Sequence, residues 1–181
     1  MPGKLIGHWP ILLALLCPPI ANIQAMPEDR DQPIKITADS AERSEQVEET
    51  RYTGNVVLTQ GSLRIEADSL VVHNNDADLI VATGAPATLK QTPEPGKADI
   101  NASAVRIEYD RPRDQITLKE TAKIEQDGAV VMGAIINYQV LEQRVIAVGD
   151  PSSQAKQRVE VIIPPDKVNT DSTKATSAPQ T

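Results

Sequence analysis

YTGNVVLTQGSLRIEADSLVV, residues 52–72, predicts a β-hairpin and decides the fold class. Apolar and polar residues alternate over residues 63–68, and this period of two places alternate side chains on opposite faces of a strand. A shorter alternating run precedes it at residues 52–58, and Gly61 supplies the permissive backbone of a tight turn between the two runs. Because a lone hairpin cannot bury its apolar face, the hairpin needs further strands beside it.

The rest of the chain repeats this unit. The pattern Ile-x-Ala-polar occurs at residues 36–39, 65–68 and 100–103, and a weaker copy begins at Ile136. A repeat that contains one hairpin per copy predicts hairpins stacked on hairpins with one continuous apolar face. No apolar run with the 3.6-residue period of a helix follows residue 50, so we predict an all-β fold.

Further strands are predicted wherever alternation or short aliphatic runs are bounded by turn residues. In the strand at residues 100–109 the alternation slips once, which indicates a β-bulge. Asp127-Gly128 is a two-residue hairpin turn. The acidic residues 39–50 are compatible with a short helix or with a loop of weak strand character. Ile116 and Leu118 share a face, and so do Ala122 and Ile124. The other predicted strands are 33–38, 79–82, 87–90, 130–140, 145–148 and 158–163.

The two ends of the chain differ from this pattern. Residues 1–25 are interpreted as a secretory signal peptide, with a positive start, an apolar stretch and the small residue Ala25 suited to cleavage. The apolar stretch is shorter than the roughly 20 residues of a membrane-spanning helix, and Leu16 before Cys17 does not suit a lipoprotein. Residues 26–163 form one predicted domain, and the polar residues 164–181 a disordered tail.

Composition excludes several classes of function. The chain carries 18 Lys and Arg against 25 Asp and Glu, a net charge of −7, whereas binding to nucleic acid requires basic surfaces. Phenylalanine is absent and aromatic residues make up 2% of the chain, so the interior must be aliphatic. We therefore expect a β-protein with a smooth core of Val, Ile, Leu and Ala, and no nucleic-acid partner.

Catalytic and metal-binding signals are weak. His73 lies in a predicted turn without cysteine partners, which argues against a zinc site. No phosphate-binding loop or nucleophile motif occurs, and we expect no catalytic residue, no metal and no cofactor. Asp39 and Asp68, at equivalent repeat positions, remain the one candidate carboxylate pair for glycoside chemistry, although exposed aspartates at turns are common.

The repeat resembles a known family. DQPIKI at residues 31–36, YTGNVVLTQG at residues 52–61 and IEAD at residues 65–68 are similar to the LptA family of periplasmic lipopolysaccharide bridge proteins, which carry the OstA-like domain. The resemblance covers about residues 31–163. It implies an open, twisted β-jellyroll, a V-shaped trough of short antiparallel strands that holds the acyl chains of lipopolysaccharide on its aliphatic inside.

The resemblance also implies partners and a location. It places the protein in the periplasm as a head-to-tail homo-oligomer that joins an inner-membrane transport complex to an outer-membrane lipopolysaccharide-inserting barrel. The expected pairing edges are residues 33–38 and 158–163. Alternatives are a membrane-tethered docking member of the same pathway, a carbohydrate-active β-repeat enzyme and a self-assembling scaffold. The side chains expected to contact lipid are Ile34, Ile36, Tyr52, Val56, Leu58, Leu63, Ile65, Leu89, Ile107, Tyr109, Leu118, Ile124 and Tyr138.

Overall fold

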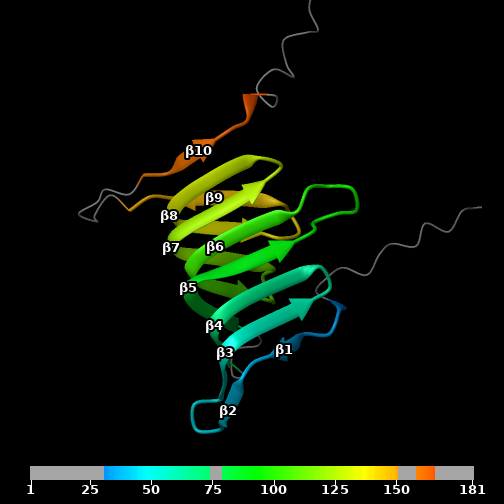
Figure 1. Cartoon of the computed structure of the whole chain (residues 1–181), viewed down its shortest axis with the longest axis vertical. Coiled ribbons are helices and arrows are strands. Elements are labelled where there is room, and N and C mark those ends of the chain that lie inside the picture. Colours follow the sequence, from blue (N-terminus) through cyan, green and yellow to red (C-terminus); the bar gives the residue numbers. More distant parts are fainter. Residues whose placement is uncertain (1–30, 74–78, 151–157, 166–181) are drawn as a thin grey trace, which may run out of the picture.

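A single antiparallel sheet makes up the structure, a computed structural model that describes residues 31–73, 79–150 and 158–165. Its ten strands follow the order β1-β3-β4-β5-β6-β7-β8-β10, with β2 also paired to β3 and β9 also paired to β8. Figure 1 shows them as a twisted stack of hairpins. The strands are β1 (Lys35–Thr37), β2 (Ser40–Ser44), β3 (Glu49–Gln60), β4 (Leu63–His73), β5 (Leu79–Gln91), β6 (Ile100–Asp110), β7 (Gln115–Gln126), β8 (Ala129–Gln139), β9 (Arg144–Val148) and β10 (Glu160–Ile162).

The sheet is open at both ends. At one end β1 and β2 pair with different halves of β3, and at the other end β10 and β9 pair with different halves of β8. The first and last strands are not joined to each other, so the sheet does not close into a barrel. The predicted all-β, open β-jellyroll is confirmed, and the predicted edges at residues 33–38 and 158–163 contain β1 and β10.

Each long strand is interrupted near its middle. The strand pairing shifts register between Thr53 and Val56, and matching shifts follow in every later pair of long strands. Bulges bend strands and increase their twist. Because the shifts lie side by side, the whole sheet bends along one line and presents two halves to each other.

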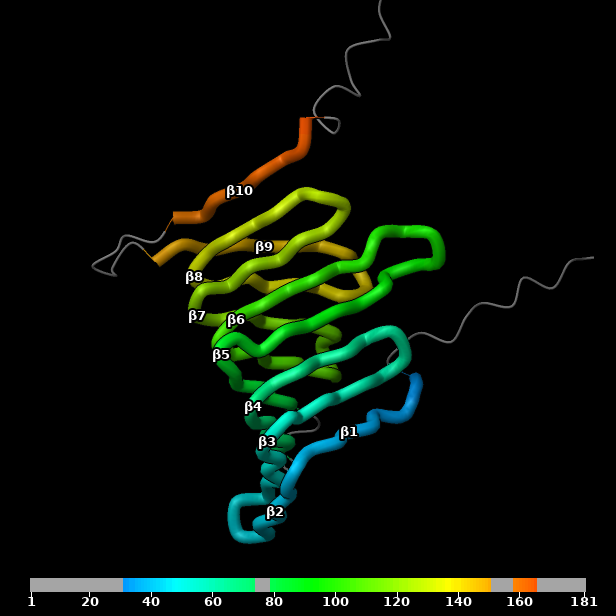
Figure 2. Tube along the Cα trace, viewed as in Figure 1, coloured from blue at the N-terminus to red at the C-terminus, as the bar shows by residue number. Residues whose placement is uncertain are grey.

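We call the two halves limb A and limb B. Figure 2 shows limb A in front, with the hairpin turns of its strands toward the right, and limb B behind it. Limb A contains β1, β10 and strand residues 56–60, 63–67, 87–91, 100–104, 122–126 and 129–133. Limb B contains β2, β9 and strand residues 49–53, 69–73, 79–83, 106–110, 115–119 and 135–139.

The core lies between the limbs. Buried side chains from both limbs form one hydrophobic cluster, which includes Leu58 and Ile65 of limb A and Leu70 and Ile107 of limb B. Alternation explains this cluster, because every second residue of each half-strand faces the other limb. The resemblance implied a trough whose aliphatic inside is occupied by acyl chains. Instead the opposite limb covers it, and Leu58 has 0% of its surface exposed.

Local predictions were confirmed at the tight turns. Asp127 and Gly128 both have positive φ, as a type I′ hairpin turn requires, and Gly61 has a φ of 56° in the turn between β3 and β4. The predicted bulge of the strand at residues 100–109 is present between Ser103 and Arg106.

Three local expectations differ from the structure. Residues 79–82 and 87–90 belong to one strand, β5, because pairing resumes beyond the bulge at Gly84. The acidic residues 39–50 form no helix, and their strand character is stronger than expected, since β2 forms a hairpin with the start of β3 across a turn at residues 45–48. His73 is the last residue of β4 rather than a turn residue. The predicted signal peptide, residues 1–25, lies outside the described residues, as does the predicted tail beyond residue 165.

Candidate functional site

The inner face of the folded sheet is the candidate site. On limb A one continuous row of cross-strand partners runs from β1 to β10. These partners are Ile36, Leu58, Ile65, Leu89, Ala102, Ile124, Val131 and Val161. Limb B carries a matching row of Tyr52, Leu70, Ala82, Ile107, Leu118, Ile136 and Ala147. The sheet therefore lines its interior with apolar side chains from one edge to the other, and all of those in the two rows are aliphatic except Tyr52.

Every residue expected to contact lipid lies on this inner face. Ile34, Ile36 and Tyr52 are partly buried near the N-terminal edge and pack against the core cluster. The others are buried members of the cluster: Val56, Leu58, Leu63, Ile65, Leu89, Ile107, Tyr109, Leu118, Ile124 and Tyr138. The strand parity used to choose them is thus correct on both sides of the bulges.

Further residues of the inner face were missed. Leu70, Ile80, Ile100, Ile116 and Ile136 are all buried in the same cluster. For four of them the signal was available, because Ile116 and Ile136 lie two residues from a chosen residue on the same half-strand, and Leu70 and Ile80 pair directly with one. Ile100 lies two residues from Ala102, which pairs with the chosen Leu89.

A few polar groups interrupt the aliphatic interior. The Tyr109 hydroxyl donates a hydrogen bond to Gln60 Oε1 (3.3 Å), which joins limb B to limb A. Gln60 Nε2 in turn donates to the backbone carbonyl of Gln32 (3.0 Å). The Tyr138 hydroxyl is buried without a hydrogen-bond partner among the described residues. Burial, with a further contribution from the nearby Asp114 carboxylate, raises the pKa of Tyr138 to about 12.

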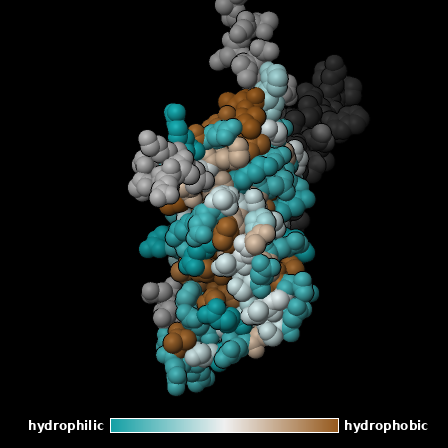
Figure 3. Space-filling model, turned by 60° about the vertical axis from the view of Figure 1, so that its left-hand side comes forward, coloured by the Kyte–Doolittle hydropathy of each residue, from teal (hydrophilic) through white to brown (hydrophobic). Residues whose placement is uncertain are grey.

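Toward β9 and β10 the inner face becomes exposed. Val161 ends the limb A row and is 54% exposed, and Val145, which pairs with the inward-facing Tyr138, is 39% exposed. Figure 3 shows apolar surface gathered at this upper end of the molecule. At the opposite edge, Ile36 of β1 is partly buried against the core cluster, and its outward-facing neighbours Lys35 and Thr37 are polar. The two open edges therefore differ in character.

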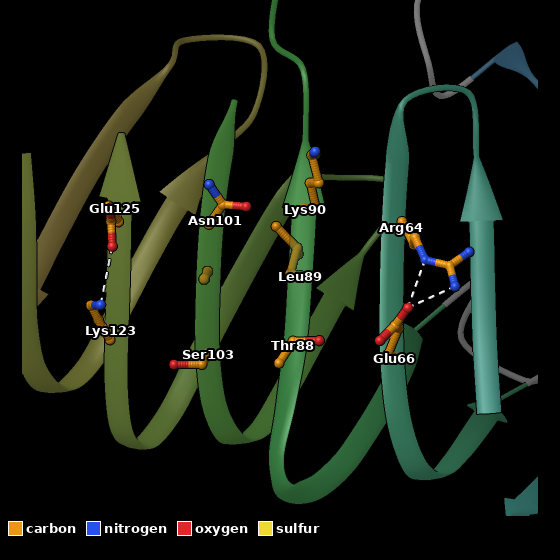
Figure 4. Close-up of a pocket in the computed structure, with 10 residues that line it drawn as sticks. Arg64, Glu66, Thr88, Leu89, Lys90, Asn101, Ser103, Lys123 and Glu125 are labelled. Atoms are coloured by element: carbon orange, nitrogen blue, oxygen red, sulfur yellow. Dashed lines mark hydrogen bonds and ion pairs between the residues drawn. The ribbon is translucent and has the colours of Figure 1, made fainter. Parts of the chain in front are cut away.

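The outer face has a different composition. A shallow depression of about 400 Å³ on limb A is lined mainly by charged and hydroxyl side chains of β4 to β7, as Figure 4 shows. Its cations are neutralised locally: Arg64 pairs with Glu66 (2.6 Å), and Lys123 Nζ pairs with Glu125 (3.1 Å). These paired charges describe a solvated outer surface rather than a site that selects a charged ligand.

The candidate carboxylate pair for glycoside chemistry, Asp39 and Asp68, lies at the protein surface. Asp39 Oδ2 accepts a hydrogen bond from Asn55 Nδ2 (2.8 Å), and the Asp39 amide donates to the Gly54 carbonyl (2.9 Å). Asp39 therefore braces the bulge of β3, where Gly54 has a φ of 80°. His73 Nδ1 lies 3.1 Å from Glu49 Oε1 on the neighbouring strand.

The described ranges contain neither a metal-binding cluster nor a membrane-spanning helix. No group of three or more His, Cys, Asp or Glu side chains there is arranged to hold a metal ion. The same residues contain no helix long and apolar enough to cross a membrane.

Comparison with known proteins agrees with this geometry. The chain is 32% identical over 149 residues to the lipopolysaccharide export system protein LptH of Pseudomonas aeruginosa, covering 79% of this chain and 85% of LptH. It is 28% identical over 170 residues to LptA of Haemophilus influenzae (91% and 96% covered) and 32% identical over 144 residues to LptA of Escherichia coli K12 (77% and 76% covered).

A solved structure has the same fold. The crystal structure of LptH, described as the LptA-homologous periplasmic component of the lipopolysaccharide transport device of Pseudomonas aeruginosa, superposes with a TM-score of 0.71 at 31% identity. The match covers 77% of this chain and 100% of that one. Residues 35–144 also match the family described as LptA/(LptD N-terminal domain) LPS transport protein. The chain is therefore a member of the LptA family of non-enzymatic lipopolysaccharide transport proteins.

Proposed function

We propose that this protein carries lipopolysaccharide across the periplasm by holding its acyl chains between limbs A and B. The observation that carries the proposal is the pair of apolar, mostly aliphatic rows that run across the whole inner face. Acyl chains have no fixed shape, so a surface of Val, Ile, Leu and Ala suits them better than a shaped pocket. Burial of each CH₂ contributes about 0.8 kcal/mol, which gives affinity without specific polar contacts.

Lipid binding requires the limbs to separate. In the structure the limbs pack directly on each other, and most of the expected lipid-contact residues are buried by protein. Acyl chains would replace one apolar contact with another, so the interior exchanges protein packing for lipid packing. This exchange keeps the cost of opening low compared with the exposure of the same surface to water.

We further propose that copies of the chain stack head to tail by strand pairing. Each open edge of the sheet has one strand in limb A and one in limb B. These are β1 and β2 at the N-terminal edge, and β10 and β9 at the C-terminal edge, so limb A of one copy can continue into limb A of the next. When β1 of one copy pairs with β10 of the next, Ile36 follows Val161 and the inner row continues across the junction. Strand addition at an open edge is an established mode of assembly, and contacts of this head-to-tail kind extend rather than close.

The same edges would join the chain to its partners. The inner-membrane transport complex and the outer-membrane lipopolysaccharide-inserting barrel would each add a strand at one end of the stack. This role requires a periplasmic location after removal of residues 1–25, and LptH, the relative with the matching structure, is described as periplasmic.

A matched pair of variants tests the lipid site. Val161 and Ile162 are neighbours in β10, exposed to 54% and 49%, but Val161 faces inward and Ile162 outward. Val161→Asp should weaken binding of fluorescent lipopolysaccharide severalfold, because a charge would end the apolar row. Ile162→Asp should leave binding within about twofold. Equal effects of the two substitutions would contradict lipid binding on the inner face.

Stacking is tested by the association state. Val161→Pro removes one backbone N–H of β10 and prevents regular strand pairing there. Analytical ultracentrifugation should show concentration-dependent oligomers of the unmodified chain and a shift toward monomer for the variant. Unchanged oligomers would show that this edge does not form the junction.

A further inference from the structure

The tips of limbs A and B meet at what we call the mouth, the side of the molecule opposite the bend. Limb A contributes the β5–β6 loop, residues 92–99, and limb B contributes the turn at residues 140–143 between β8 and β9. Gln143 Nε2 donates a hydrogen bond to Glu94 Oε1 (2.7 Å), and Lys97 Nζ donates to Gln143 Oε1 (3.1 Å). Both ends of one amide group on limb B are therefore held by a single loop of limb A.

The loop itself is held in the shape that this contact needs. Lys97 Nζ pairs with Glu94 Oε2 (3.0 Å), so the two groups that hold Gln143 also hold each other. The hydrogen bonds that Lys97 and then Gln143 donate lower the pKa of Glu94, which keeps the carboxylate charged. At the base of the loop, the Thr92 hydroxyl donates to Asp99 Oδ1 (2.7 Å). The three residues Glu94, Lys97 and Gln143 form what we call the clasp.

The length of the loop supports a role beyond joining two strands. The neighbouring hairpins of limb A, β3–β4 and β7–β8, are closed by residues 61–62 and 127–128 alone. A two-residue connection is thus sufficient for hairpins in this limb. Figure 2 shows the β5–β6 loop, in green, projecting beyond those turns. The additional residues supply the reach to limb B.

A second contact crosses between the limbs deeper in the molecule. The buried hydrogen bond from the Tyr109 hydroxyl to Gln60 Oε1 also connects limb B to limb A. The two limbs are therefore joined by an exposed contact at the mouth and a buried contact beneath it. Exposed polar contacts contribute little stability. Opening the clasp should therefore require less free energy than breaking the buried hydrogen bond.

We propose that the clasp is a gate: it closes the mouth in the lipid-free protein and must open for a lipid whose polar head group projects into solvent. This inference rests on the proposed function. Acyl chains match the inner face, but sugars and phosphates buried between aliphatic rows would lose their hydration without replacement hydrogen bonds. The head group must therefore leave the interior through the mouth, where Glu94, Lys97 and Gln143 now close it.

Crosslinking across the mouth tests the gate. Glu94→Cys and Gln143→Cys are introduced into the full chain with Cys17, the single native cysteine, replaced by Ser. A short bismaleimide then joins the two thiols. The control pair, Thr88→Cys with Ser103→Cys, joins neighbouring strands on the outer face of limb A and does not cross the mouth.

Binding of fluorescent lipopolysaccharide is compared for each protein before and after crosslinking. The crosslinked clasp pair should bind at least tenfold more weakly than the same protein without crosslinker, whereas the control pair should change by less than twofold. Equal binding by the crosslinked and uncrosslinked clasp pair would overturn the gate but leave the proposed function standing. Failure of the unmodified chain to bind lipopolysaccharide would overturn both.

A spin-label measurement gives a second readout. Labels at residues 94 and 143 should report a longer distance when lipopolysaccharide is added, while labels at residues 88 and 103 should report no change. An unchanged distance between residues 94 and 143 in the lipid-bound protein would contradict opening of the mouth.

Discussion

Truncation of Leu58 distinguishes a packed interior from an open groove in the lipid-free protein. Leu58 lies on the inner face of limb A, in β3 beside the edge strand β1, with 0% of its surface exposed. Leu58→Ala removes three carbon atoms, and at about 0.8 kcal/mol for each buried CH₂ the lost transfer free energy is about 2.4 kcal/mol. The cavity left between the limbs adds to this cost, so we expect a total of about 3–4 kcal/mol.

The neighbouring residue provides the control. Val57 is aliphatic and on the same strand but faces outward and is only partly buried. Val57→Ala should lower the free energy of unfolding by less than about 1 kcal/mol. Urea titrations of both variants, followed by circular dichroism, give the free energies of unfolding. A cost below about 1 kcal/mol for Leu58→Ala, or equal costs for the two variants, would refute the packed interior and favour a groove that is open without lipid.

Two further predictions concern contacts within and between the limbs. Partial burial favours protonation of Glu108, but hydrogen bonds from Lys119 and Arg106 outweigh it and lower its pKa below the ordinary 4.5. The stabilisation from Glu108 is therefore complete above pH 4.5 and is lost as the pH falls through the lowered value, so urea titrations should show a smaller acid-induced loss of stability for Glu108→Gln than for the unmodified chain. A double-mutant cycle of Gln60→Ala and Tyr109→Phe should give a coupling free energy of about 1 kcal/mol; additive effects would show that the hydrogen bond between the limbs contributes nothing.

Much of this fold could be predicted from the alternation of apolar and polar residues in the sequence. The β3–β4 hairpin, the Asp127-Gly128 turn and the bulge in β6 were all predicted from residues close to one another in the chain. The inward-facing residues were also placed correctly across the bulges. In β3 the extra residues Gly54 and Asn55 leave Tyr52 and Val56 on the same face of the sheet. Counting every second residue through the bulge therefore still identified the inward-facing side chains of β3.

Other features depend on partners that alternation does not specify. The period of a strand says which side chains share a face but not what covers that face, so the packing of limb A on limb B was missed. β2 is polar, and it is a strand because the long β3 offers it a pairing edge. The contact between Gln143 and the β5–β6 loop joins residues far apart in the sequence, and no local pattern indicates it.

Site-specific photo-crosslinking in intact cells tests the central claim most directly. Ile107 and Glu108 are adjacent in β6, but Ile107 is buried between the limbs and Glu108 lies on the outer face beside Lys119. A photoreactive amino acid at Ile107 should form adducts with lipopolysaccharide, and the same group at Glu108 should form none above background. Adducts of equal yield at both positions, or at Glu108 alone, would contradict an acyl-chain site between the two limbs.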